Sequence, residues 1–137
     1  MTFVLDNSVA LAWCFKDEQT DALMALLDRL TEQGAVVPQL WPLEALNGLL
    51  TAERRGRIGG RDRQRLTGFL QDLPIAIDDE TARRVWATTA QLAEQHRLTA
   101  YDAAYLELAL RLNLPLATGD KALRTAAHSA GVDLLPA

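Results

Sequence analysis

Four acidic residues of the chain stand beside apolar stretches, where an ionised side chain is costly unless something compensates its charge. Asp6 and Asp120 each follow a short apolar segment. Glu44 lies in another such segment, and Asp102 lies at the start of a long apolar run. A carboxylate beside a core needs hydrogen bonds, a cationic partner or a metal ion. Four such acids in one small chain predict a pocket for a hard divalent cation, Mg²⁺ or Mn²⁺, which prefers oxygen ligands and often bridges to substrate phosphates.

Each of the four acids also has an ordinary structural explanation at a helix N-terminus. Either Asp6 or Ser8 is suited to cap the first helix, and Asp120 is suited to cap the helix that begins at Lys121. Thr99 and Asp102 have the spacing of a capping box, and Glu44 complements the positive end of its own helix. Because helix N-termini and strand C-termini meet at one edge of a parallel sheet, these structural roles would still bring the acids together.

Short apolar strands alternate with helices along the chain, which indicates a parallel sheet covered on both faces. Strands are predicted at 2–5, 35–38, 75–77, 115–118 and 132–135. Helices are predicted at about 8–15, 21–33, 42–55, 60–73, 80–95, 100–112 and 121–130. The helix at 100–112 is apolar nearly all round and should be central. The helix at 80–95 is amphipathic, with a predicted apolar stripe of Val85, Trp86, Thr89, Leu92 and Ala93.

The composition is typical of one soluble domain in a reducing compartment. The chain has 137 residues, of which 49% are hydrophobic, and this length suits a single domain. No apolar stretch is long enough to span a bilayer, and no secretory leader pattern is present. Cys14 is the only cysteine, so an internal disulfide is excluded. We therefore expect a single cytoplasmic domain over residues 1–137.

The positive charge of the chain is concentrated in one short segment. The formal net charge is −4, so the molecule as a whole should not attract polyanions. Six arginines nevertheless crowd residues 54–65: Arg54, Arg55, Arg57, Arg61, Arg63 and Arg65. This arginine cluster is suited to contact phosphates, but it is equally well explained as the solvated surface of two helices and their connection.

Other catalytic groups are poorly represented. His96 and His128 show no metal-ligand spacing, and the position of Cys14 between two aromatic residues favours a buried thiol over a nucleophile. The glycines at 56–60 do not fit a phosphate-binding loop. Hydrolysis assisted by a carboxylate-bound metal ion is the chemistry that remains.

Four segments of the chain together resemble the PIN-domain ribonucleases. They are Val-Leu-Asp-Asn-Ser-Val at 4–9, Glu-Ala-Leu-Asn at 44–47, Leu-Thr-Ala-Tyr-Asp-Ala-Ala-Tyr-Leu at 98–106 and Ala-Thr-Gly-Asp-Lys-Ala-Leu at 117–123. The resemblance covers nearly the whole chain, and the segments around Asp102 and Asp120 are the most specific. Within this family the chain is most similar to the VapC-type toxins of toxin–antitoxin pairs.

The resemblance implies a three-layer α/β/α sandwich with a short, mainly parallel central sheet. It also implies a Mg²⁺- or Mn²⁺-dependent endoribonuclease that cleaves RNA, is neutralised by a cognate antitoxin and forms a homodimer. Thr118 matches the hydroxyl residue two positions before the last acid, and Asn47 and Ser8 are further polar neighbours expected around the acids. The arginine cluster would contact either RNA or the antitoxin. Carried over residue by residue, the catalytic and metal-binding acids match Asp6, Glu44, Asp102 and Asp120.

Three alternatives compete with this interpretation. A receiver-like phosphoacceptor domain would use an acidic pair such as Asp78 and Asp79, but that pair belongs after the first strand, where this chain has only Asp6. A non-catalytic interaction module would have the same fold with its acids serving only as helix caps. A structure-specific DNA nuclease would need additional arches and clamps, for which the chain is too short.

Overall fold

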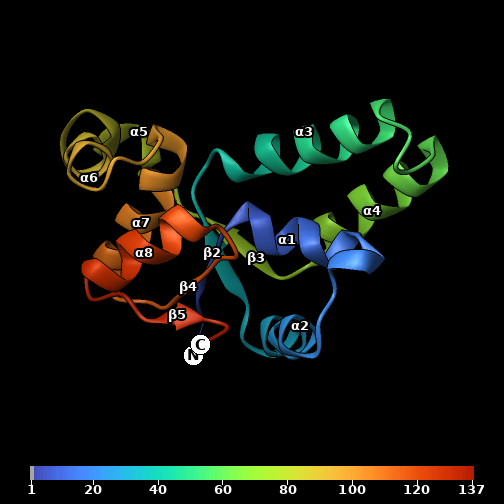
Figure 1. Cartoon of the computed structure of the whole chain (residues 1–137), viewed down its shortest axis with the longest axis horizontal. Helices are drawn as coiled ribbons and strands as arrows, with labels where there is room; N and C mark the ends of the chain where they lie inside the picture. The colour runs from blue at the N-terminus through green and yellow to red at the C-terminus, as the bar shows by residue number, and fades with distance from the viewer. Residues whose placement is uncertain (1) are drawn as a thin grey trace.

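Five short strands form one parallel sheet at the centre of the molecule (Figure 1). The computed structural model describes residues 2–137. Each neighbouring pair of strands is parallel, and Val4 stands opposite Val36 on one side and Leu116 on the other. The parallel sheet predicted from the sequence is confirmed, although some strands are shorter than predicted. In sheet order the strands are β3 (Ile75–Ile77), β2 (Ala35–Val37), β1 (Val4–Leu5), β4 (Leu116–Ala117) and β5 (Leu134–Leu135).

The remaining elements are helical, and none of those within residues 2–137 has the length and apolar character needed to cross a membrane. Most begin and end within two residues of the predicted positions. The elements are α1 (Asn7–Cys14), the 3₁₀ turn η1 (Lys16–Glu18), α2 (Asp21–Gln33), α3 (Trp41–Arg54), α4 (Gly60–Asp72), α5 (Thr81–Arg84), the π turn η2 (Val85–Thr89), α6 (Ala90–His96), α7 (Ala100–Leu112) and α8 (Lys121–Ser129).

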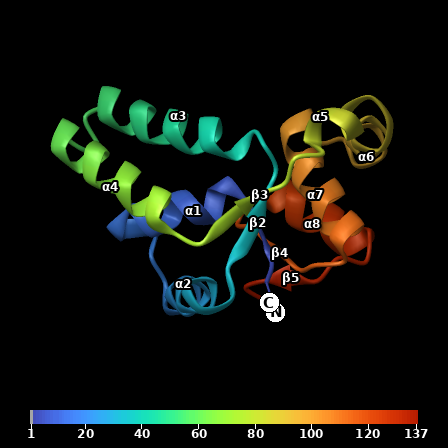
Figure 2. The same ribbon diagram turned by 180° about the vertical axis from the view of Figure 1, so that it is seen from behind.

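Helices cover both faces of the sheet, as expected for an α/β/α sandwich. In Figures 1 and 2 the strands lie between α1 and α2 on one side and α7 and α8 on the other. Helices α3 and α4 form a hairpin that packs on α1 and extends away from the strands (Figure 1). The β1 residues Val4 and Leu5 are fully buried, and all residues of α7 from Ala103 to Ala109 are buried. The prediction that α7 is central is confirmed.

The segment predicted as one helix over residues 80–95 consists of three elements. Helix α5 is followed by the π turn η2, and α6 begins only at Ala90. A π turn holds more residues than an α-helical turn, so side chains around it depart from the 3.6-residue spacing. The predicted apolar stripe is wrong at Trp86, whose side chain is 91% exposed, whereas Thr89 and Leu92 are buried as predicted.

Arg111, near the end of α7, binds three carboxylates, one from α7 itself and two from the segment between β3 and α5. Its guanidinium lies 2.7 Å from Asp78 and 2.8 Å from Glu107, and it also pairs with Glu80. The side chains of Arg111 and Asp78 are only 14% and 11% exposed. Hydrogen bonds from Arg111 hold the pKa of Asp78 below its usual range. Asp78 is therefore an anion that ties the end of β3 to α7, which removes the basis for a receiver-like acidic pair.

We predict that Arg111→Met lowers the free energy of unfolding by about 3 kcal/mol, because Asp78 and Glu107 lose their buried cation. The stability difference between Arg111→Met and the wild type should become smaller in acid. The pKa of Asp78 is lower in the folded than in the unfolded protein, so the ion pair stabilises the fold above the ordinary carboxyl pKa. This stabilisation disappears as the pH falls through the pKa that Asp78 has in the fold. Urea unfolding at neutral and acidic pH measures both effects. Arg83→Met, at a residue of α5 that is 79% exposed, is the control and should change stability by less than about 0.5 kcal/mol. Equal losses in the two variants would contradict the assignment.

Candidate active site

Parallel pairing of β1 with β4 brings Asp6 beside the loop that follows β4. The backbone amide of Asp6 donates to the carbonyl of Ala117 at 2.9 Å. The Thr118 hydroxyl donates to Asp6 Oδ2 at 2.8 Å, and the Ser8 hydroxyl donates to the same oxygen at 2.6 Å. Asp6 and Thr118 are both buried, at 5% and 0% exposure. Two hydroxyls from different elements thus fix one carboxylate at the carboxyl edge of the sheet.

The same loop brings Asp120 to this edge. The amide of Asp120 donates to Thr118 Oγ1 at 3.0 Å, and the amide of Gly119 donates to Ser8 Oγ at 3.0 Å. Asp120 Oδ1 accepts a hydrogen bond from the amide of Leu123 and so caps α8, as predicted. Capping occupies one oxygen of the carboxylate, so the cap and a role in the acid site are compatible.

Asp102 comes from the first turn of α7, and Glu44 from the first turn of α3. The Thr99 hydroxyl accepts from the amide of Asp102 at 3.1 Å, which confirms the predicted N-terminal cap. One turn after Asp102, the hydroxyl of Tyr105 donates to Glu44 Oε1 at 2.6 Å. This bond joins two helices that are 61 residues apart in the sequence. The four predicted acids therefore reach one region from four separate elements.

The electrostatics confirm that the acids are close enough to affect one another. Burial raises the pKa of Asp6. Burial also raises the pKa of Glu44, and the charges of Asp6 and Asp102 raise it further. Burial, together with the charges of Asp6 and Asp120, raises the pKa of Asp102 to about 6. Within residues 2–137, none of the four acids forms an ion pair with a lysine, arginine or histidine. The region has a surplus of negative charge.

This donor set fits a hard, partly hydrated cation. Carboxylate and hydroxyl oxygens are the ligands that Mg²⁺ and Mn²⁺ prefer. No three acidic, histidine or cysteine side chains in the described part of the chain are arranged as a ready-made metal cage. Mg²⁺ does not need such a cage, since it usually takes one or two protein carboxylates and keeps several waters. The arrangement therefore suits a cation that keeps part of its water shell.

The polar neighbours expected around the acids are only partly confirmed. Ser8 and Thr118 contact Asp6 as described above, but Asn47 is exposed and makes no hydrogen bond to Glu44. The partner of Glu44 is instead Tyr105, a residue of α7 for which no role in the site was predicted. The only available signal was its spacing, three residues after Asp102 on the same helix face.

A groove of about 390 Å³ lies between α1 and α3. Ser8 lines it at one point and Arg55 at another, with Gly48 between the two helices. A Cβ at Gly48 would lie only 2.5 Å from a methyl carbon of Leu11, so the Leu11 side chain would have to move to admit a larger residue. Ser8, which donates a hydrogen bond to Asp6, connects this groove to the acid region, whereas none of the four acids lines it.

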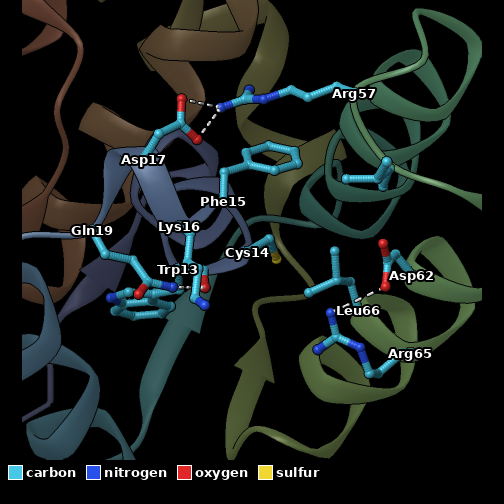
Figure 3. A pocket seen from close by; sticks show the side chains of 11 residues that line it. Trp13, Cys14, Phe15, Lys16, Asp17, Gln19, Arg57, Asp62, Arg65 and Leu66 are labelled. Atoms are coloured by element: carbon cyan, nitrogen blue, oxygen red, sulfur yellow. Dashed lines mark hydrogen bonds and ion pairs between the residues drawn. The ribbon is translucent and has the colours of Figure 1, made fainter.

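The arginine cluster is divided between paired and unpaired side chains. Arg57 binds Asp17 and Glu18 and stacks over the ring of Phe15, 3.9 Å from its centroid. Arg65 pairs with Asp62, and Figure 3 shows both arginines around a cavity of about 490 Å³. Arg63 pairs with Glu53 at 2.6 Å. Within the arginine cluster, the side chains that are exposed and without an ion pair to any of residues 2–137 are Arg54, Arg55 and Arg61.

Cys14 lines the same cavity (Figure 3) and is half-buried at the end of α1. Burial raises the pKa of its thiol to about 11. The thiol is therefore protonated at neutral pH and is not an activated nucleophile, in agreement with the sequence-based expectation.

Comparison with solved structures supports the architecture. The structure of FitAcB from Neisseria gonorrhoeae is similar with a TM-score of 0.68 and 20% identity, covering 98% of this chain and 96% of that one. The structure of VapBC2 from Rickettsia felis bound to a DNA fragment from their promoter has a TM-score of 0.66 and 14% identity, covering 98% and 97%. At these identities the likeness establishes the fold.

Comparison of sequences establishes the family. VapC ribonuclease Mb0985 of Mycobacterium bovis and ribonuclease VapC9 of Mycobacterium tuberculosis are each 34% identical over 119 residues, which cover 85% of this chain and 84% of theirs. The family model described as PIN domain matches residues 3–129. These residues include all four acids and the hydroxyls of Ser8 and Thr118. The chain therefore belongs to the PIN domain family, among members of the VapC ribonuclease type.

Proposed function

We propose that this protein is a metal-dependent endoribonuclease that cleaves RNA phosphodiester bonds, and that it is the toxin of a toxin–antitoxin pair. The observation that carries the proposal is the convergence of four carboxylates without a cationic side chain among them. Its similarity to VapC ribonucleases supports RNA as the substrate. A non-catalytic module would have no use for these mutually repelling charges.

In this proposal Asp6, Glu44, Asp102 and Asp120 hold Mg²⁺ or Mn²⁺. When bound there, the cation would supply a water of lowered pKa and would offset charge on the phosphoryl oxygens. Ser8 and Thr118 keep Asp6 in one orientation by donating to its Oδ2. Either Asp102 or Asp120 orients the attacking water or accepts its proton, since each stands at a helix N-terminus beside the other acids.

We also propose a cognate antitoxin protein as the partner, and a homodimer as the assembled state. Similarity to the VapBC2 and FitAcB structures supports the antitoxin. Exposed large apolar side chains, including Trp86 at 91% and Leu43 at 74%, provide surface for association between copies.

The unpaired arginines contact either the RNA or the antitoxin. Arg55 lines the groove that also contains Ser8, so a chain lying in that groove would reach both the arginine and the acid site. Arg54 and Arg61 lie on the same α3–α4 hairpin. Arg57, Arg63 and Arg65 are already engaged by acids of this chain and contribute less to any contact.

Purified protein should cut RNA into discrete fragments in the presence of Mg²⁺ or Mn²⁺, and EDTA should abolish the cleavage. Asp6→Asn should reduce the rate at least about 100-fold, because it removes a charge that the cation requires. Asp79→Asn, at an exposed acid outside the site, is the matched control and should cleave like the wild type. RNA electrophoresis gives the result. Intact RNA with folded wild-type protein and either cation would favour the non-catalytic module.

The acid site should also be visible in the stability of the metal-free protein. The pKa of Asp102 is raised to about 6, so its ionised form destabilises the fold, increasingly as the pH rises through and above the ordinary value of 3.8. We predict that Asp102→Asn raises the free energy of unfolding by about 1 kcal/mol at neutral pH, a value reduced to allow for solvent screening, with little effect near about pH 4.

Thermal unfolding with EDTA and with Mn²⁺ measures this effect. Mn²⁺ should raise the melting temperature of the wild type and leave that of Asp102→Asn nearly unchanged. A variant less stable than the wild type in EDTA at neutral pH would show that Asp102 serves mainly the α7 cap.

Replacing Arg54, Arg55 and Arg61 together by Gln should separate the two roles left open for the arginines. If they contact RNA phosphates, the slope of log K against log salt should fall by about 2 for single-stranded RNA. If they contact the antitoxin, RNA binding should be unchanged and antitoxin affinity should fall. Fluorescence anisotropy measures both, with Arg83→Gln as a control on another helix. No change in either affinity would assign the three arginines to the solvated surface.

A further inference from the structure

Tyr105 is the one fully buried tyrosine of the described chain, and its hydroxyl donates a hydrogen bond to an acid of the proposed site. Its side chain has 0% exposure, in the middle of α7. A buried phenol needs a hydrogen-bond partner, and here the partner is Glu44 Oε1 at 2.6 Å. A neutral acceptor or a water would satisfy a phenol equally well. The use of a carboxylate from another helix calls for a reason beyond core packing.

Glu44 is the acid whose position is least fixed by its own element. Helix α3 packs on α1 and α4 and belongs to a hairpin that extends from the strands (Figure 1). By contrast, Asp6 follows a central strand, and Asp102 begins the buried helix α7. Among residues 2–137, the hydrogen bond from Tyr105 is the only one that joins a side chain of α3 to α7. Glutamate has three rotatable bonds, so without this bond its carboxylate would sample several positions.

We propose that Tyr105 is a positioning residue of the acid site, which holds Glu44 Oε1 so that Oε2 is presented to the cation. Glu44 Oε2 accepts no hydrogen bond from any described residue. The charges of Asp6 and Asp102 act on Glu44, so its carboxylate lies on their side of the helix. The inference rests on the proposed metal-dependent function and adds to it a residue that does not touch the cation.

The geometry links Glu44 and Asp102 through one rigid element. Tyr105 lies three residues after Asp102 on α7, so the same helix carries one acid and the hydroxyl that positions another. The distance between the two acids is then set by the first turns of α7 and not by the packing of the α3–α4 hairpin. Tyr105 would be hydrogen-bonded to a metal ligand without touching the metal. Removing a partner of this kind typically lowers metal affinity or activity by about 10- to 100-fold.

Tyr105→Phe removes one hydroxyl and keeps the ring, so it separates positioning from packing. We expect the Mn²⁺ dissociation constant to rise about 10-fold and kcat to fall while KM for RNA is unchanged. Tyr101→Phe is the matched control: it makes the same change on the same helix at a residue that is 63% exposed, and it should bind Mn²⁺ like the wild type. Titration calorimetry or Mn²⁺ electron paramagnetic resonance measures the affinity, with circular dichroism as a check on folding.

A double-mutant cycle tests whether Tyr105 acts through Glu44. In a Glu44→Gln background, Tyr105→Phe should cause no further loss of Mn²⁺ affinity. The same loss in both backgrounds, or an unchanged affinity in folded Tyr105→Phe, would overturn the proposal. A second variant leaves Tyr105 intact: Glu44→Asp is one methylene too short to reach both the phenol and the cation. It should lose Mn²⁺ affinity, and wild-type affinity in this variant would also overturn the proposal.

The wild-type protein distinguishes the failure of this inference from that of the proposed function. Wild type that binds Mn²⁺ and cleaves RNA, with Tyr105→Phe indistinguishable from it, refutes only the positioning role. Wild type that neither binds Mn²⁺ nor cleaves RNA refutes the function on which that role depends.

Discussion

The adjacency of β1 and β4 in a parallel sheet is the constraint on which the acid site depends. It places the residues after both strands at one edge, so the Thr118 hydroxyl reaches Asp6 at 2.8 Å although the two are 112 residues apart. Two further contacts build on this pair. The Ser8 hydroxyl donates to the same oxygen of Asp6, and the loop that carries Thr118 also carries Asp120. Helix α7 then brings Asp102 to the edge, and its Tyr105 brings in Glu44. A sheet with β4 elsewhere would separate Asp6 from Thr118 and Asp120.

The chain treats its buried carboxylates in two opposite ways. Around Arg111, the carboxylates of Asp78, Glu80 and Glu107 are all bound by one guanidinium, which suits a structural tie between β3 and α7. At the sheet edge the acids have hydroxyl partners but no cationic side chain, and their pKa values are raised by burial and by one another. The acids around Arg111 therefore have a cationic partner within the chain. We propose that the acids at the sheet edge take their cationic partner from solution, which is why the surplus of negative charge carries the functional proposal.

Local patterns in the sequence were sufficient to predict the elements that carry the site. The alternation of apolar strands and helices predicted the parallel sheet, and the apolar run at 100–112 predicted the central helix. The spacing of Thr99 and Asp102 predicted the cap of that helix. The π turn was not predictable, because a helix-like apolar spacing persists through it and nothing in the sequence signals that Trp86 turns outward. Helix periodicity describes regular turns only.

Contacts between distant segments were the other limit. The role of Tyr105 depends on which helix lies opposite it, and spacing along α7 carries no such information. The six arginines of the cluster also could not be told apart in the sequence, yet Arg57 forms an ion pair with Asp17 and Arg65 forms one with Asp62 (Figure 3). The convergence of the acids was predictable since strand ends meet by topology, whereas pairings of individual side chains depend on packing.

The most direct test of this account is the position of Mn²⁺ in crystals of the wild-type protein, located by its anomalous scattering. The account predicts an anomalous peak at the carboxyl edge of the sheet, contacting carboxylates of the Asp6, Glu44, Asp102 and Asp120 set and retaining ordered waters. A peak at another group of acids, such as those around Arg111, or no peak at Mn²⁺ concentrations that support RNA cleavage, would contradict it.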